Sequence, residues 1–218
     1  MRALRMATLP SGPEDAIWTR VQGVKTTLFG LGDVGGKQLE LEMKALHNGQ
    51  ELALYFRWPD KEPSLTKDAW RFDGTTWKRQ GGDEDRLALF FPIGEYPAFT
   101  AGGCAAMCHA TDKGGYMATN APTEKADLWH WKSYRSNPLN FADDGYATMK
   151  PANADTGRMN DPGTGGDRRN QTTDGSKPLY MQDPAKQPTA PGFLLDDEKV
   201  EIKDYSIFKA GDTPPTAS

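Results

Sequence analysis

The two cysteines of this chain carry its most specific chemical signal. Cys104 and Cys108 are the only cysteines in the 218-residue sequence, and His109 follows the second directly. Two thiols can add to the vinyl groups of a porphyrin, and an adjacent imidazole can then bind the iron. The usual attachment motif has two residues between the cysteines, whereas this one has three, a rarer variant. The spacing therefore predicts one covalently attached haem c, with His109 as an axial ligand of the iron.

Three other uses of the cysteine pair compete with haem attachment. A structural disulfide is the strongest of them, because such bridges are common in small exported domains. A zinc site needs four ligands, and the sequence offers no second Cys or Cys/His pair to complete one. A thioredoxin-like redox pair needs C-x-x-C near a βαβ pattern, and neither is present. The histidine directly after Cys108 favours haem, since a disulfide has no use for it.

The iron of a haem electron carrier usually has a second protein ligand, drawn from His, Met or Lys. Met181 is the favoured candidate, because it lies in a small apolar island that follows a long polar stretch. The alternative is that Met181 only fills a gap in the core. His130 is the other candidate, although strand alternation sends it to the face opposite Trp129 and Trp131. A hydrogen-bonding or surface role for His130 therefore competes with ligation.

Several nearby residues could help to form a haem pocket. Trp129 and Trp131 are expected in the core, where they would also make a dry wall for a porphyrin. Lys132 and Arg135 could pair with the haem carboxylates, although an exposed, solvated position is expected of each. Met107 is expected to point out of the attachment loop. The weaker candidates for an iron ligand are Met117, Met149 and Met159.

Strand patterns dominate the part of the chain that must position these residues. Apolar and charged residues alternate over 39–45. After an Asn-Gly pair that signals a hairpin turn, a return strand over 51–58 has Leu52, Leu54, Phe56 and Trp58 on one face. A second hairpin is expected over 70–77 around an Asp-Gly pair, and further strands over 86–91 and 127–132. No segment shows a sustained helical period with caps at both ends. The sequence predicts an all-β fold, an antiparallel β-sandwich.

Length and composition suggest one large domain with many loops. The haem-binding sandwich is expected over residues 17–212, after an N-terminal extension over 1–16 and before a frayed tail over 213–218. The apolar fraction of 37%, with 23 glycines and 16 prolines, predicts a modest core. Residues 150–178 are expected to form a long irregular loop. Strand-like patterns return at 193–195 and 200–208.

Charge and hydropathy exclude two classes of partner. The net charge of −4 does not suit a nucleic-acid-binding surface. No apolar run approaches the roughly 18 residues of a membrane helix. The first six residues have the basic start of an export signal, but the apolar segment that should follow is missing. Covalent haem attachment in bacteria takes place outside the cytoplasmic membrane, so a periplasmic or otherwise extracytoplasmic location is expected.

Several short motifs occur in an order that suggests a family. Phe56-Arg57-Trp58 precedes Asp85-Arg86-Leu87, then the Cys-His motif, then Trp129-His130-Trp131-Lys132. Over roughly residues 17–209 the chain resembles the haem-binding domain of the γ subunits of ethylbenzene and dimethylsulfide dehydrogenases and of related c-type cytochromes. The resemblance implies a β-sandwich that holds haem in loops at one end. Those γ subunits bind haem b through Met and Lys, whereas the cysteines here imply a c-type version, and the family's second ligand cannot be carried over.

The function expected is that of a monohaem c-type cytochrome, an electron carrier and not itself an enzyme. The resemblance implies a subunit or partner of a molybdenum oxidoreductase, and a respiratory multi-cytochrome assembly is the other setting. The sequence contains no nucleophile motif, metal-carboxylate cluster or phosphate-binding loop. Two alternatives stay open: a sandwich binding module with a structural haem, and a haem enzyme or sensor with an open sixth position.

Overall fold

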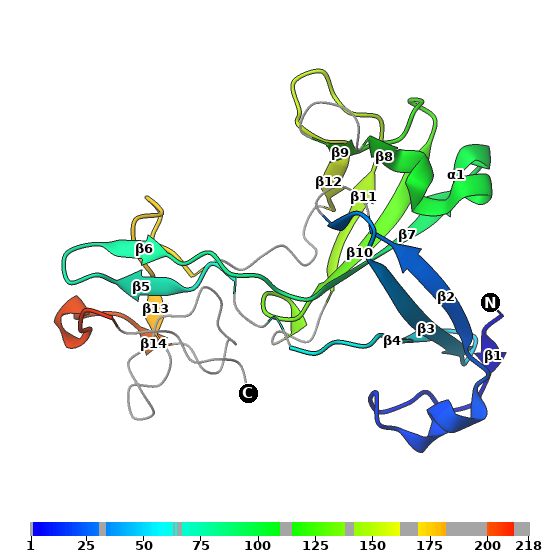
Figure 1. Cartoon of the computed structure of the whole chain (residues 1–218), viewed down its shortest axis with the longest axis horizontal. Coiled ribbons are helices and arrows are strands. Elements are labelled where there is room, and N and C mark those ends of the chain that lie inside the picture. Colours follow the sequence, from blue (N-terminus) through cyan, green and yellow to red (C-terminus); the bar gives the residue numbers. More distant parts are fainter. Residues whose placement is uncertain are drawn as a thin grey trace. The chain divides into compact units, whose positions relative to one another are not determined.

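The computed structural model of the chain describes residues 2–30, 34–62, 64, 67–109, 115–137, 142–161, 170–181 and 200–211 (Figure 1). The chain divides into two compact units, Met1–Glu62 and Pro63–Ser218. The single domain expected over 17–212 stays a prediction. The strand-like segment over 193–195 and the tail over 213–218 lie outside the described residues.

The first unit is a four-stranded sheet organised around its longest strand, β3. Strand β3 pairs with β4 along one edge, in the register His47↔Leu52 to Glu42↔Arg57. Along its other edge it pairs with β2 and, through two residues, with β1, which runs parallel to it. The residues expected as an N-terminal extension thus contribute a strand to this sheet. The elements of the unit are β1 (Leu4–Arg5), the 3-10 helix η1 (Ala16–Arg20), β2 (Val24–Phe29), β3 (Gln38–His47) and β4 (Leu52–Arg57).

The predicted Asn-Gly hairpin is confirmed as strands β3 and β4. The Asn48 side-chain oxygen accepts hydrogen bonds from the backbone N–H groups of Gln50 and Glu51, at 2.9 and 2.8 Å. Gly49 has φ of +102°, a conformation that glycine adopts without strain. One face of the sheet packs on the segment around η1, in a cluster centred on Trp18, Val21 and Leu46.

The second unit contains the sheet that concerns function, with strand order β12-β11-β10-β7 (Figure 1). Each neighbouring pair is antiparallel, and β10 pairs with β7 along its whole length. Both strands were predicted; β7 runs past Pro92, which an edge strand tolerates because the missing N–H is not needed for pairing. The strands are β7 (Arg86–Ile93), β10 (Lys125–Lys132), β11 (Asp143–Ala147) and β12 (Arg158–Asn160).

Short elements connect and flank this sheet. Between β7 and β10 lie the helix α1 (Pro97–Gly102), the 3-10 helix η3 (Gly103–Met107) and the paired strands β8 (Cys108–His109) and β9 (Tyr116–Met117). The unit also has the hairpin β5 (Trp70–Phe72) and β6 (Trp77–Arg79), the pair β13 (Tyr180–Met181) and β14 (Val200–Glu201), and the 3-10 helix η5 (Tyr205–Ile207). Within the described ranges, every helix is too short to cross a membrane.

The all-β class is confirmed, and its antiparallel sheets are those expected of a β-sandwich. Two details differ from the prediction. The turn of the second hairpin has four residues, 73–76, because Asp73 accepts hydrogen bonds from both Thr75 and Thr76 and draws them into the turn. The stretch expected as an irregular loop over 150–178 contains strand β12, which pairs with Gly145–Ala147 of β11.

Candidate functional site

The Cys-His motif begins where helix α1 ends. Gly103 closes the helix with φ of +59°, and its N–H donates to the Phe99 carbonyl. Helix η3 then carries Cys104, and Cys108 opens strand β8. Both cysteines are free thiols; Cys104 is exposed and Cys108 is half-buried. A positive φ at position 103 favours glycine, so this residue sets the direction in which the motif leaves the helix.

The motif is anchored by its central methionine and by two backbone contacts. Met107 is fully buried, in a cluster with Tyr96, Ala126 and Ala147. The 3-10 turn directs Met107 into the core, where a thioether side chain adapts to the available space. The Met107 carbonyl accepts from Ala118 N–H at 3.0 Å, which joins the motif to the segment after β9. The Asn120 side chain also donates to the Ala106 carbonyl, at 2.9 Å.

The imidazole of His109 lies flat against an aromatic ring. In the β8–β9 pair His109 stands opposite Tyr116, and the two rings stack with centroids 4.5 Å apart and planes 13° from parallel. His109 Nε2 is buried from solvent. The ammonium of Lys150 lies 5.3 Å from the centroid of the Tyr116 ring, which is a cation–π distance. Tyr116 therefore fixes the orientation of the ring that was predicted to bind iron.

A pocket of about 540 Å³ opens beside Tyr116, over the sheet. In the strand register Gly145 lies between Leu128 and Asn160, which both line the pocket, so no side chain stands between them on this face. A Cβ atom at Gly145 would lie 2.5 Å from the carbonyl oxygen of Met159 on the neighbouring strand, closer than side chains approach. The residues lining the pocket are Gly115, Tyr116, Met117, Leu128, Asp155, Thr156, Arg158, Met159 and Asn160.

Arg158 places a positive charge at this pocket and binds His130. Its Nη2 donates to His130 Nδ1 at 3.1 Å. Burial, reinforced by the nearby cations of Lys132 and Arg158, lowers the pKa of His130 to about 4. The imidazole is therefore neutral near pH 7, and because Nδ1 accepts from a guanidinium, its proton sits on Nε2. In this arrangement His130 has a hydrogen-bonding role, and it would need to leave Arg158 or change tautomer to bind a metal.

Two cations expected on the surface are buried instead. The Lys132 side chain is 7% exposed and pairs with Asp143 on the next strand. The Arg135 side chain is 11% exposed, and its Nη2 and Nε lie 2.5 and 2.6 Å from Oε1 of Glu84, whose side chain is fully buried. The prediction of exposed, solvated positions was wrong because it considered each cation alone, whereas each has a carboxylate partner from a distant part of the sequence.

Side chains alternate between the two faces of β10, and this alternation places Trp129 on the outer side of the sheet. Ala126, Leu128 and Lys132 are buried, so the even-numbered residues of β10 face inward. Trp129 is 37% exposed and packs on Phe91, with ring centroids 5.0 Å apart. The core position expected for Trp129 is therefore wrong. Trp131, on the same face, is half-buried.

Met181 belongs to a different cluster of the second unit. It is 8% exposed and packs with Trp70, Ile202 and Phe208. None of these residues belongs to the Cys-His motif or to the pocket beside Tyr116. Two of the methionines considered weaker candidates, Met117 and Met159, do line that pocket, and Met149 is 43% exposed.

Sequence reasoning did not find Tyr116 or Arg158. Each reaches the site through strand pairing, Tyr116 opposite His109 and Arg158 opposite Ala147. The one local signal for Tyr116 was the short Tyr-Met strand after the motif, because a strand that follows so closely could have been expected to pair with Cys108–His109.

The donor set fits a covalently attached haem. Free thiols at Cys104 and Cys108 would supply the thioether links, and His109 would supply an axial nitrogen. Among the described residues, Arg158 in the pocket lining and Lys150 near the Tyr116 ring are cations that could pair with the haem carboxylates.

A group of three carboxylates lies on the outer face of the same sheet. Oxygen atoms of Asp127, Asp144 and Asp161 come within 4.8 Å of one another. Burial, and then the charges of Asp127 and Asp161, raise the pKa of Asp144. Acidic groups of this kind are common on protein surfaces without a metal, so we assign no metal site to them.

Comparison with known protein families gives a match over most of the chain. The family described as ethylbenzene dehydrogenase matches residues 15–217. No curated protein and no solved structure matches the chain.

Proposed function

Because this chain belongs to the ethylbenzene dehydrogenase family, we propose that it is an electron-transfer subunit with one haem c covalently attached at Cys104 and Cys108. His109 is the proposed axial ligand. The observation that carries the proposal is the chemistry of this motif: two free thiols at attachment spacing, followed directly by an imidazole whose orientation is fixed by Tyr116. The family supports the same conclusion, since it suggests a cytochrome-like subunit of a molybdenum oxidoreductase.

The chain's own residues have distinct roles in this proposal. Met107 and the Ala118 contact hold the motif on the core, so that the positions of the two thiols are set before attachment. The residues lining the pocket beside Tyr116 would contact the porphyrin, and the guanidinium of Arg158 in that lining would be a cation for a haem carboxylate. Once attached, the group supplies an iron that exchanges single electrons. Cys104 is exposed, so the attachment lies at a surface where a partner can approach.

The proposed partner is a molybdenum oxidoreductase or another cytochrome, in a periplasmic or otherwise extracytoplasmic compartment. Met181 and His130 stay the predicted candidates for the second axial ligand. A thioether ligand would give a higher reduction potential than a second imidazole, so the measured potential discriminates between them.

The test of haem attachment is the mass of the intact native protein together with its pyridine haemochrome spectrum. We expect one added tetrapyrrole and a c-type spectrum. The Cys104→Ser, Cys108→Ser double variant should lose the covalent haem. Thr19→Ser, a hydroxyl-conserving change in the other unit, is the control for expression and should keep the haem. A native mass without the added group would refute the proposal.

A binding module with a structural haem is the second candidate function, and Trp129 is the observation that favours it. Such a module needs aromatic side chains on a solvent face, and this indole is exposed beside Phe91. Quenching of tryptophan fluorescence by soluble oligosaccharides tests this candidate. Quenching that is lost in Trp129→Ala would support it, and unchanged fluorescence would exclude oligosaccharides as the ligand.

A further inference from the structure

The hairpin of β5 and β6 has one aromatic face and one charged face. Trp70, Phe72 and Trp77 point toward the cluster that contains Met181. The Trp70 indole is 3% exposed, and its N–H donates to the Asn170 carbonyl at 2.6 Å. A lone hairpin is marginally stable, so this packing is what holds the two strands in place. The charged face is thus presented on a fixed support.

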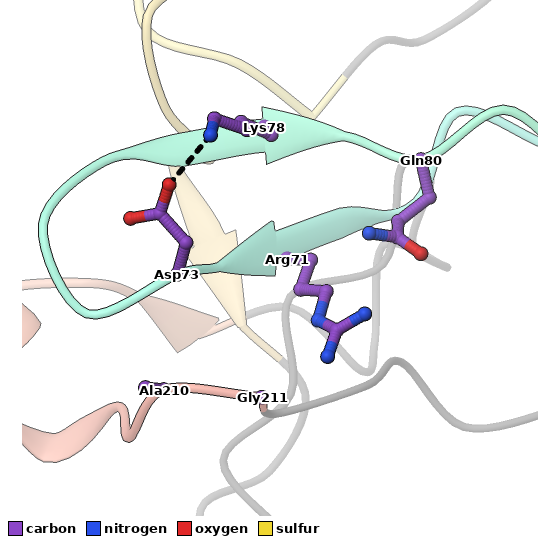
Figure 2. Close-up of a pocket in the computed structure, with 6 residues that line it drawn as sticks. All are labelled: Arg71, Asp73, Lys78, Gln80, Ala210 and Gly211. Carbon is purple, nitrogen blue, oxygen red and sulfur yellow. Dashed lines mark ion pairs between the residues drawn. The ribbon is translucent and has the colours of Figure 1, made fainter.

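The charged face forms one wall of a pocket of about 440 Å³. The other wall is the segment after η5, which one backbone hydrogen bond ties to the hairpin: Gly211 N–H donates to the Phe72 carbonyl at 3.0 Å. Ala210 lies so near the turn that a Cβ atom added at Gly74 would be 3.3 Å from the Ala210 Cβ. Figure 2 shows the residues that line the pocket: Arg71, Asp73, Lys78, Gln80, Ala210 and Gly211.

Two cations of this pocket stand directly opposite each other. Arg71 and Lys78 are a cross-strand pair, an arrangement that is unfavourable for like charges. Asp73 compensates Lys78, with its carboxylate 2.7 Å from the ammonium (Figure 2). The same carboxylate accepts hydrogen bonds from the backbone of Thr75 and Thr76, and its pKa lies well below the ordinary value, chiefly because of Lys78. Its acceptor positions are therefore already used.

Arg71 is left as the uncompensated charge of the pocket. Among the residues that the structure describes, none forms an ion pair with it, and its side chain extends from β5 toward Gly211 (Figure 2). The charged groups lining the pocket sum to one positive charge, in a chain whose net charge is −4. A guanidinium matches the two oxygens of a carboxylate or phosphate, and the amide of Gln80 can add a neutral donor.

We infer that this pocket is a binding site for a small carboxylate, held by a bidentate pair with Arg71. The volume is within the range of small-molecule sites. Asp73 favours a monoanion, because its carboxylate repels a second negative charge on the ligand. Among the described residues that line the pocket none is aromatic, because the aromatic face of the hairpin is turned toward the core, so this lining offers no ring on which a nucleobase could stack. The site shares no residue with the pocket beside Tyr116, so this inference is independent of the haem proposal.

The experiment is a titration of the full-length protein, as purified, followed by NMR of the arginine Nε–H and glutamine NH₂ groups. The probes are sodium acetate, sodium phosphate and sodium chloride at equal ionic strength, which keeps charge screening constant. We expect a saturable shift of the Arg71 and Gln80 signals with acetate and a weaker response to phosphate. Chloride should give only a small, non-saturating shift.

Three variants make the test specific. Arg71→Gln should weaken acetate binding about tenfold or more, because it removes a charge-assisted pair. Asp73→Asn keeps the acceptor for the turn but removes the negative charge, and should tighten binding roughly two- to fivefold. Lys203→Gln, an exposed cation of the same unit outside the pocket lining, should leave binding unchanged.

Saturable acetate binding that survives in Arg71→Gln would overturn the inference, as would identical responses to acetate and chloride. Tighter binding of phosphate than of acetate would overturn the identification of the ligand as a carboxylate and indicate a phosphate instead. Asp73→Asn is expected to strengthen acetate binding, a result that partial unfolding of the variant cannot imitate. Weaker acetate binding by Asp73→Asn would refute the charge argument.

Discussion

The buried pair of Arg135 and Glu84 gives a prediction whose size follows from the structure. Oε1 of Glu84 accepts from both Nη2 and Nε of Arg135, and the two side chains are 0% and 11% exposed. Arg135→Met would retain most of the apolar volume and leave a buried carboxylate without its main partner. Loss of one member of a buried pair costs roughly 3–5 kcal/mol, a large part of the roughly 5–15 kcal/mol that stabilises a typical domain.

Arg86→Met is the matched control for this prediction. Arg86 Nε lies 4.0 Å from the same Glu84 oxygen, but its side chain is 43% exposed. Because the Arg86 side chain is partly in water and lies at the limit of ion-pair distance, its pair with Glu84 should contribute only about 0–1 kcal/mol, and the same substitution should have a much smaller effect there. The assay is urea denaturation followed by circular dichroism. With a slope of roughly 2 kcal/mol per molar urea, Arg135→Met should lower the midpoint by about 1.5–2.5 M and Arg86→Met by less than about 0.5 M.

A double variant separates charge from packing. Adding Glu84→Gln to Arg135→Met removes the uncompensated charge and should recover part of the lost stability. If Arg135→Met and Arg86→Met lowered the midpoint equally, or if the double variant were no more stable than Arg135→Met alone, the reasoning from burial would be wrong.

Three further predictions concern the site. The folded-state pKa of His130 lies at about 4, below the ordinary 6.5, so the contribution of the neutral imidazole to stability is complete above pH 6.5 and is lost as the pH falls toward 4. The urea midpoint of His130→Gln should therefore fall less steeply over this pH range than that of the wild type. Equal slopes would contradict the assignment. Gly145→Ala should cost about 1–3 kcal/mol because its Cβ would press on the neighbouring strand, whereas Gly81→Ala, with no atom within 4 Å of its Cβ, should be neutral or slightly stabilising in the same assay. Met181→Leu conserves core volume and should cost less than about 1.5 kcal/mol in stability. If Met181 binds the iron, the same variant should change the reduced spectrum and the reduction potential. An unchanged spectrum would remove Met181 from the candidate ligands.

The strands that could be predicted are those with local signals. Strand β3 alternates apolar and charged residues before Asn48-Gly49, and β4 after it has a large apolar residue at every second position. Strands β7 and β10 are rich in aromatic and aliphatic residues. Strand β11 lacked such a signal, because Asp143-Asp144-Gly145 contains residues that disfavour strands. It forms through pairing with β10 on one side and β12 on the other, and no single-sequence pattern reports that pairing.

The candidate site was predictable only where it is local in sequence. The Cys-His motif is visible as six consecutive residues, whereas Tyr116 and Arg158 reach it by strand pairing. The burial of Trp129 and Lys132 was predicted the wrong way round. The apolar Trp129 was expected inside and the charged Lys132 outside. The ion pair of Lys132 with Asp143 reverses that rule, since a compensated charge can occupy an inward-facing position.

The aromatic hairpin has a consequence for the order of events during synthesis. Its tryptophans are covered by Met181, Ile202 and Phe208, which leave the ribosome long after the hairpin itself. Until then Trp70 and Trp77 have no apolar cover from those residues, and exposed aromatic strands in a growing chain are prone to aggregate. The Cys-His motif is complete well before this final closure. The nascent protein therefore passes through a stage at which both cysteines have been synthesised while the cluster around Trp70 is still open.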